Sequence, residues 1–135
     1  MERGLKGLKI YQMACELERK VHETVKGFPA EEKFRKTDQV IRASSSVCDN
    51  ISEGYGKFSY QSKIHSYYTA RGEAEEAREQ IVRAGNIGIL NKEKSQELES
   101  DYTALIKGIN GYIRFLRKEK DKKENALSKT QDLST

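Results

Sequence analysis

The stretch FPAEEKFRKTDQVIRASSSVCDNISEGYG, residues 28–56, decides the fold of this chain. It contains the only proline of the sequence, Pro29, and two glutamates follow that proline closely. Proline suits the first turn of a helix, and acidic side chains suit the positive end of the helix dipole. Two glycines near the end of the stretch are typical of a helix terminus. The stretch therefore predicts a helix from about residue 30 to residue 53.

Helical periodicity is visible in this stretch and in three other segments, at about residues 10–28, 59–88 and 91–117. In each segment apolar or small residues recur at steps of three and four, as they do along one face of a helix. Ser59 and Asn91 are good N-caps for the last two segments. The expected core positions of the second helix are Phe34, Thr37, Ile41, Ser44, Cys48 and Ile51.

Short connections between these long helices force neighbours to run antiparallel. The sequence therefore predicts an all-α protein, an antiparallel up-down-up-down four-helix bundle formed by residues 1–118. Residues 119–135 are polar and low in hydrophobicity, so we expect a disordered C-terminal tail.

Composition excludes several classes of protein. The chain has 135 residues, of which 34% are charged, and a net charge of +4. No run of about 18 apolar residues is present, and the N-terminus lacks the apolar region of a signal peptide. We expect a cytoplasmic protein with no membrane partner. Cys15 and Cys48 are predicted to be reduced thiols that fill apolar space.

Signs of catalysis are few. His22 and His65 have no cysteine or aspartate at metal-ligand spacing, and no histidine follows a glutamate by three residues. Gly54-Tyr55-Gly56-Lys57 lacks the preceding strand that a phosphate-binding loop needs. We therefore predict no catalytic residues, no metal and no cofactor. An enzyme would instead require a pocket with convergent ionisable groups of perturbed pKa.

A set of motif positions spans the second helix and the third. The first part is the pattern FP-x-x-E followed by Q-x-x-R-A-x-x-S-V-x-x-N-I-x-E-G. Its positions are Phe28, Pro29, Glu32, Gln39, Arg42, Ala43, Ser46, Val47, Asn50, Ile51, Glu53 and Gly54. The second part is Ala70-Arg71-Gly72, then Glu76 and Gln80-Ile81. The chain resembles the bacterial four-helix-bundle proteins encoded in intervening sequences of 23S rRNA genes, over about residues 5–117.

This resemblance implies a homopentameric ring. Relatives of the family include the accessory variability proteins of diversity-generating retroelements, which bind a reverse transcriptase and nucleic acid through a basic surface. The chain departs from the family pattern at Ser52, where alanine is usual, and at Glu73, where serine is common. These departures leave the expected fold intact and weaken the transfer of finer functional detail.

The polar motif residues fall on one face of the second helix and are predicted to form a subunit interface or to serve the structure. Contact with a partner or with nucleic acid is the alternative. The residues of this prediction are Gln39, Arg42, Ser46, Asn50, Glu53 and Gly54 at the second helix, together with Gly72 and Glu76 of the third.

Aromatic and basic residues alternate between Tyr55 and Arg71, and a basic run follows in the fourth helix. Aromatic planes beside cations suit nucleic acid, because bases stack and phosphates are neutralised. Both chain ends of an antiparallel bundle lie at the same end, so we expect their basic patches to merge. The predicted nucleic-acid-binding residues are Lys6, Lys9, Lys57, Lys63, Arg71, Arg114, Arg117, Lys118 and Lys120.

Two functions therefore remain open. The first is a non-enzymatic, oligomeric scaffold that binds RNA or DNA electrostatically through these basic patches. The alternative is a protein-interaction accessory subunit of a mobile-element or reverse-transcriptase complex, without direct contact to nucleic acid.

Overall fold

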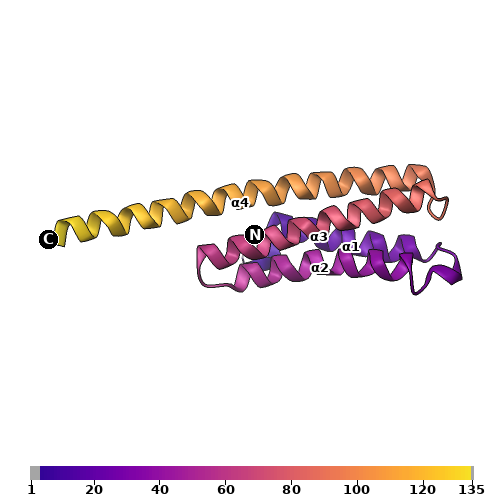
Figure 1. Cartoon of the computed structure of the whole chain (residues 1–135), viewed down its shortest axis with the longest axis horizontal. Helices are drawn as coiled ribbons and strands as arrows, with labels where there is room; N and C mark the ends of the chain where they lie inside the picture. The colour runs from indigo at the N-terminus through magenta and orange to yellow at the C-terminus, as the bar shows by residue number, and fades with distance from the viewer. Residues whose placement is uncertain (1–3, 135) are drawn as a thin grey trace.

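Four helices make up the chain, whose computed structural model describes residues 4–134. They are α1 (Lys9–Val25), α2 (Lys36–Gly56), α3 (Tyr60–Asn86) and α4 (Lys92–Ser134), with single 3-10 turns η1 (Leu5–Gly7) and η2 (Ala30–Glu32). No strand occurs within residues 4–134. Figure 1 shows successive helices running in opposite directions, and α1 and α3 each pack against α2 and α4. The predicted all-α four-helix class is confirmed.

The core lies between the four helices. Five residues of α1 at helical spacing are buried, from Ile10 to Val25. Helix α3 contributes a narrow stripe of four buried alanines, from Ala70 to Ala84, between Tyr67 and the end of the helix. Small side chains let neighbouring helix backbones approach closely. Helix α4 supplies large buried side chains, among them Leu98, Tyr102, Leu105, Ile109, Ile113 and Leu116.

Close helix contacts occur at three glycines. A Cβ atom placed on Gly85 of α3 would lie 2.5 Å from Ser95 Oγ of α4. One placed on Gly54 of α2 would lie 3.0 Å from Ser66 Cβ of α3. Gly108 of α4 similarly admits Ile10 of α1. These positions fix how near the helices come to each other.

The second helix begins later than predicted. Pro29 is followed by the 3-10 turn η2, and α2 begins only at Lys36. The backbone of Arg35 (φ −120°, ψ −103°) is not helical, so it separates the two segments. The prediction that Phe34 lies in the core is wrong, because its side chain is 85% exposed. The buried face of α2 is instead centred on Val40, Ala43, Ser44, Val47, Cys48, Ile51 and Gly54.

The fourth helix ends later than predicted. Helix α4 does not stop near Arg117 but continues to Ser134, and Figure 1 shows its C-terminal part extending beyond the bundle. Residues 112–135 contain neither glycine nor proline, and ion pairs such as Lys122–Glu119 (3.3 Å) support the exposed helix. Up to residue 131, the last buried residue of α4 is Leu116. Residues 1–3 and 135 of the predicted bundle and tail lie outside the described residues.

Candidate nucleic-acid interface

Two arginines from different helices share one aromatic ring. The guanidinium carbon of Arg71, on α3, lies 4.7 Å from the centroid of the Tyr68 ring. The guanidinium carbon of Arg117, on α4, lies 5.3 Å from the same centroid. Arg71 Nη1 also donates a hydrogen bond of 2.8 Å to Asn110 Oδ1 of α4. The ring and the amide thus hold two positive charges close together, and we call Arg71 and Arg117 the arginine pair.

Carboxylates do little to neutralise the arginine pair. Arg71 Nε lies 3.8 Å from Glu75 Oε1, and both side chains of that pair are substantially exposed. Arg117 makes no ion pair with any described residue within 4.0 Å. Exposed ion pairs contribute little free energy, so the two guanidiniums keep most of their field. Such an arrangement favours an anion that can accept hydrogen bonds from both groups.

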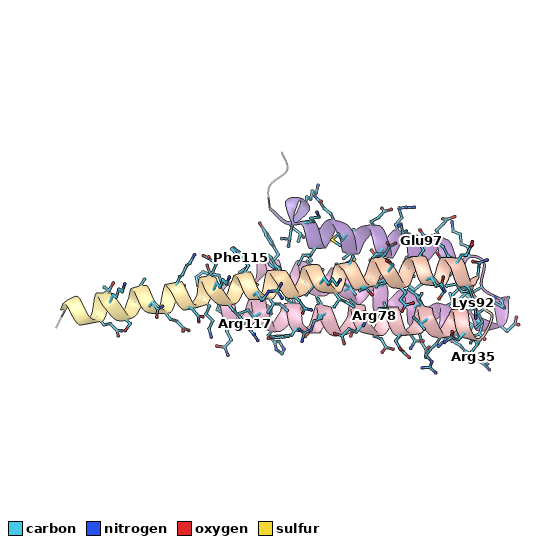
Figure 2. All side chains as sticks on the ribbon, turned by 90° about the horizontal axis from the view of Figure 1, so that it is seen from above. Arg35, Arg78, Lys92, Glu97, Phe115 and Arg117 are labelled. Carbon is cyan, nitrogen blue, oxygen red and sulfur yellow. The ribbon has the colours of Figure 1, made fainter. Side chains whose placement is uncertain are left out.

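The positive surface continues along the contact between α3 and α4. Lys123 Nζ of α4 lies 5.9 Å from the centroid of Tyr60, the first residue of α3. Farther along the bundle, Arg78 Nη1 donates a 3.2 Å hydrogen bond to Thr103 Oγ1. Figure 2 shows Arg78 and Arg117 on the same side of α4. We call this surface the α3/α4 basic edge; it comprises Tyr60, Tyr68, Arg71, Arg78, Arg117 and Lys123.

Charge is distributed unevenly between this edge and the rest of the chain. Residues 54–72 hold three lysines and arginines and no acid, a formal charge of +3. Residues 114–123 hold six such cations and two acids, a charge of +4. The whole chain carries only +4, so all other residues together carry −3. The two segments that supply most residues of the basic edge are therefore more positive than the rest of the chain.

The predicted basic residues do not all join this surface. Lys57 pairs with Glu53 at 3.2 Å. Lys63 Nζ donates to the carbonyl oxygens of Tyr55 (2.7 Å) and Gly54 (3.4 Å), and so caps the C-terminal end of α2. Lys120 pairs with Glu124 at 3.7 Å. These three side chains therefore have structural partners as well as charge.

Lys9 and Arg117, one from each chain-end patch, lie on different sides of α4. Lys9 lines a groove between α1 and α4 together with Phe115. Figure 2 shows Phe115 on the α1 side of α4 and Arg117 on the opposite side. The structure thus does not bring Lys9 to the arginine pair. Lys6, Arg114 and Lys118 are exposed.

The polar motif residues of α2 lie on the surface. Gln39, Arg42 and Glu53 are exposed, and Arg42 Nε pairs with Asp38 Oδ2 at 3.1 Å. Asn50 is half-buried, and its Nδ2 donates a 2.8 Å hydrogen bond to the Ser46 carbonyl oxygen. These bonds stay within one helix. Asn50 and Glu53 also line an open groove of about 550 Å³ with residues of α3, namely Ser62, His65, Ser66 and Thr69.

The remaining motif positions fall into two kinds. Gly54 is buried, and its close approach to Ser66 and Tyr67 explains why a side chain is absent there. Gly72 is exposed, and a Cβ atom there would meet nothing within 4 Å. The chain itself therefore gives no packing reason for glycine at position 72.

A hydrogen-bond network links the N-terminal end of α2 to α3. Lys36 Nζ donates to Gln80 Oε1 at 2.6 Å, and Gln80 Nε2 donates to Glu76 Oε1 at 2.8 Å. Burial, together with the positive charge of Arg83, lowers the pKa of Lys36. The network satisfies the buried Gln80, which gives Glu76 a structural role.

An apolar groove of about 450 Å³ lies on the surface between α1 and α4. Its lining includes Met13, Gly108 and Tyr112, and Phe115 at its edge is 51% exposed. A groove of this kind suits an apolar side chain or a helix of a partner.

Features of other functional classes are few among residues 4–134. The described side chains contain no group of three or more His, Cys, Asp or Glu residues placed to hold a metal ion. None of the described helices has the length and apolar character needed to cross a membrane. Both cysteines are free thiols, and burial raises the pKa of Cys48.

The predicted site residues lack four members of the basic edge, namely Tyr60, Tyr68, Arg78 and Lys123, and its supporting residue Asn110. The two tyrosines lie within the aromatic and basic segment that the sequence analysis singles out. Arg78 lies seven residues after Arg71, and Arg117 lies seven after Asn110, so each couple shares a helix face. That spacing is visible in the sequence, but it does not show that the two faces meet.

The comparisons with known proteins agree with the fold. The family model described as 23S rRNA-intervening sequence protein matches residues 6–111. A crystal structure of a protein of unknown function from the S23 ribosomal protein family of Bacteroides thetaiotaomicron is similar, with a TM-score of 0.72 and 21% identity. The match covers 77% of this chain and 97% of that chain. No curated protein matches the sequence. The resemblance predicted from the motif residues is confirmed.

Proposed function

The chain belongs to the family of 23S rRNA-intervening sequence proteins, and we propose that it is a non-enzymatic scaffold that binds RNA or DNA. The α3/α4 basic edge makes the contact. The observation that carries this proposal is the arginine pair, two guanidiniums from different helices held on Tyr68.

The arrangement suits phosphate chemically. Guanidinium groups bind phosphate through paired N–H donors, and their hydrogen bonds to anions are stronger than those between neutral groups. The π-face of Tyr68 and the amide oxygen of Asn110 orient the groups before any ligand arrives. Contacts to phosphate carry no sequence information. We therefore expect binding that depends strongly on salt and weakly on base sequence.

Assembly into a homo-oligomer is the second part of the proposal. The polar face of α2 and the outer face of α3 supply the interface, with Gly72 at its centre. Gly72 has open space above it and no backbone conformation that requires glycine. A second copy approaching α3 closely would explain its lack of a side chain. The five-fold ring is taken from the family resemblance.

A titration of structured RNA by fluorescence anisotropy, at salt concentrations from about 50 to 200 mM, tests the binding proposal. Removing one phosphate contact should reduce the slope of log K against log salt by about 0.7–0.9. We expect this loss for Arg117→Ala. Arg19→Ala is the matched control, because it removes one exposed arginine of α1, outside the basic edge and the proposed subunit interface, where Glu16 already pairs with it.

Two results would contradict the proposal. The first is binding that does not weaken as salt is added. The second is an equal effect of Arg117→Ala and Arg19→Ala, which would mean that only net charge matters. Circular dichroism of both variants should show an unchanged fold.

The apolar groove between α1 and α4 favours a second candidate function, an accessory subunit that binds a protein such as a reverse transcriptase. Met13 and the half-exposed Phe115 offer apolar contact area there. Purification from the native host distinguishes the two functions. A stoichiometric protein partner that stays bound at high salt, with no nucleic acid present, would favour this candidate.

A further inference from the structure

Phe58 is the most exposed large apolar side chain of the described residues. Its exposed fraction is 99%, so essentially no other atom of the chain covers the ring. Isolated apolar residues on a surface need no explanation. The position of Phe58 is nevertheless unusual, because its neighbours are aromatic and basic.

The turn that carries Phe58 is short and held at both sides. Helix α2 ends at Gly56 and α3 begins at Tyr60. Lys57 N donates to the Gly54 carbonyl oxygen at 3.3 Å. On the other side, Ser59 Oγ accepts a 3.1 Å hydrogen bond from Ser62 N and so caps α3. The residues on either side of Phe58 are therefore held by the two helices, and its ring is exposed to solvent.

The surroundings of the turn are positive and aromatic. Lys63 Nζ lies 5.6 Å from the centroid of the Tyr55 ring, and Lys123 of α4 lies 5.9 Å from that of Tyr60. Figure 1 shows the extension of α4 leaving the bundle past the end where α2 meets α3. From Tyr60 to Arg71 the rise along α3 is about 16 Å. Phe58 thus lies two residues before the start of α3, and Arg71 of the arginine pair lies about three turns along that helix.

We propose that the basic edge takes single-stranded nucleic acid, with one unpaired base stacked on Phe58 and the phosphates of the same strand on the arginine pair. The proposal rests on the proposed function and names its substrate class. An exposed aromatic ring can stack on any base with little sequence preference, because every base has a π-face. In a duplex both faces of a base are already covered, and separating a base step costs free energy. Phe58 therefore favours an unpaired strand over a duplex.

The test compares two labelled ligands by fluorescence anisotropy, a 20-nucleotide single-stranded RNA without secondary structure and the duplex of the same sequence. A third ligand is the same single strand with its bases removed at every position. The protein variants are Phe58→Ala, Phe58→Tyr and, as a matched control, Phe34→Ala. Phe34 is similarly exposed, at 85%, and lies in the connection between α1 and α2.

We expect Phe58→Ala to weaken binding of the single strand by about five-fold or more. The same change should leave the duplex and the abasic strand unaffected. Phe58→Tyr should bind the single strand as the parent does, because the ring is kept, and Phe34→Ala should have no effect.

Three outcomes would overturn the inference. One is equal weakening of the single strand and the abasic strand by Phe58→Ala. Another is no effect of Phe58→Ala while Arg117→Ala still reduces the salt slope, in which case the proposed function survives and the substrate class is wrong. The third is a change of oligomeric state in Phe58→Ala by sedimentation velocity, which would assign the ring to a protein contact. Loss of binding in neither Arg117→Ala nor Phe58→Ala would refute both proposals.

Discussion

Replacing Gly85 by alanine should destabilise the protein, although alanine is the better helix former. Gly85 is buried near the C-terminal end of α3, where a Cβ atom would lie 2.5 Å from Ser95 Oγ and 2.8 Å from Ser95 Cβ. Ser95 cannot move away freely, because its Oγ donates a 3.0 Å hydrogen bond to the Ile81 carbonyl oxygen. The new methyl group must therefore push α4 away from α3 or break that bond.

Two opposing effects decide the magnitude. Overpacking a tight contact costs about 1–3 kcal/mol. Alanine recovers at most about 1 kcal/mol over glycine in a helix interior, and less at the penultimate residue of α3. The free energy of unfolding should thus fall by about 1–2 kcal/mol. At this chain length, 1 kcal/mol corresponds to a melting temperature about 4 °C lower.

Urea denaturation followed by circular dichroism at 222 nm measures this change at fixed protein concentration. The midpoint should fall with an unchanged m-value. In a Ser95→Gly background the cost of Gly85→Ala should shrink by at least about 0.5 kcal/mol, because neighbours that clash are coupled. A Gly85→Ala variant as stable as the parent, or more stable, would refute the close contact between α3 and α4.

Two further predictions concern other sites on α3. Gly72→Ala should raise the unfolding free energy of a dilute monomer by about 0.4–1 kcal/mol, because the site is open and helical. In the proposed oligomer the same change should weaken assembly, and sedimentation velocity showing unaltered assembly would remove Gly72 from the interface. Burial raises the pKa of Tyr67 above its ordinary value near 10. Above about pH 10 the unfolded chain therefore binds fewer protons than the folded chain. The free energy of unfolding should fall as pH rises, by up to about 1.4 kcal/mol per pH unit. Tyr67→Phe should lessen that decline in alkaline urea titrations, and an undiminished decline would contradict the prediction. At pH 7 the variant should be as stable as the parent or more stable, because Tyr67 Oη is buried without a hydrogen-bond partner among the described residues.

Periodicity was a reliable guide wherever one helix face is buried. The apolar positions of α1 and α4 recur at steps of three and four, and the structure buries nearly all of them. The two predicted N-caps are confirmed, since Ser59 and Asn91 each accept a hydrogen bond from a backbone N–H three residues later. Apolar periodicity and N-caps both depend on residues within one or two helical turns, so both can be recognised in a single sequence.

The errors arise where local signals compete. Pro29 and the acids after it do begin a helical turn, but that turn closes after three residues and the nonhelical Arg35 follows. The first buried residue of α2 is Val40, four residues after the helix begins, and local sequence rules do not reveal its burial. At the other end of the chain, low hydrophobicity suggested disorder, whereas good helix formers without a breaker allow α4 to continue.

The aromatic and basic character of the candidate site could be predicted from the sequence, but the residues that meet in it could not. Alternation of aromatic and basic residues indicated a region of α3, and the basic run indicated α4. That Arg71 and Arg117 share Tyr68 follows from the rotation of α3 against α4, which the sequence does not determine. Conversely, Lys63 belongs to the same pattern but caps α2 through the Tyr55 carbonyl oxygen.

The length of α4 has a consequence for how its outer part holds its shape. The helix has 43 residues, about 65 Å in length. Among residues 92–131, buried side chains anchor it up to Leu116 and none after that residue is buried. An isolated helix of the remaining length would be marginal in water, because the first turn is costly to form. Here the anchored part supplies that first turn, so the outer part needs only propagation, one residue at a time. The helical structure of the outer part therefore depends on the bundle. Amide hydrogen exchange along α4 should become steadily faster from Leu116 toward the C-terminus.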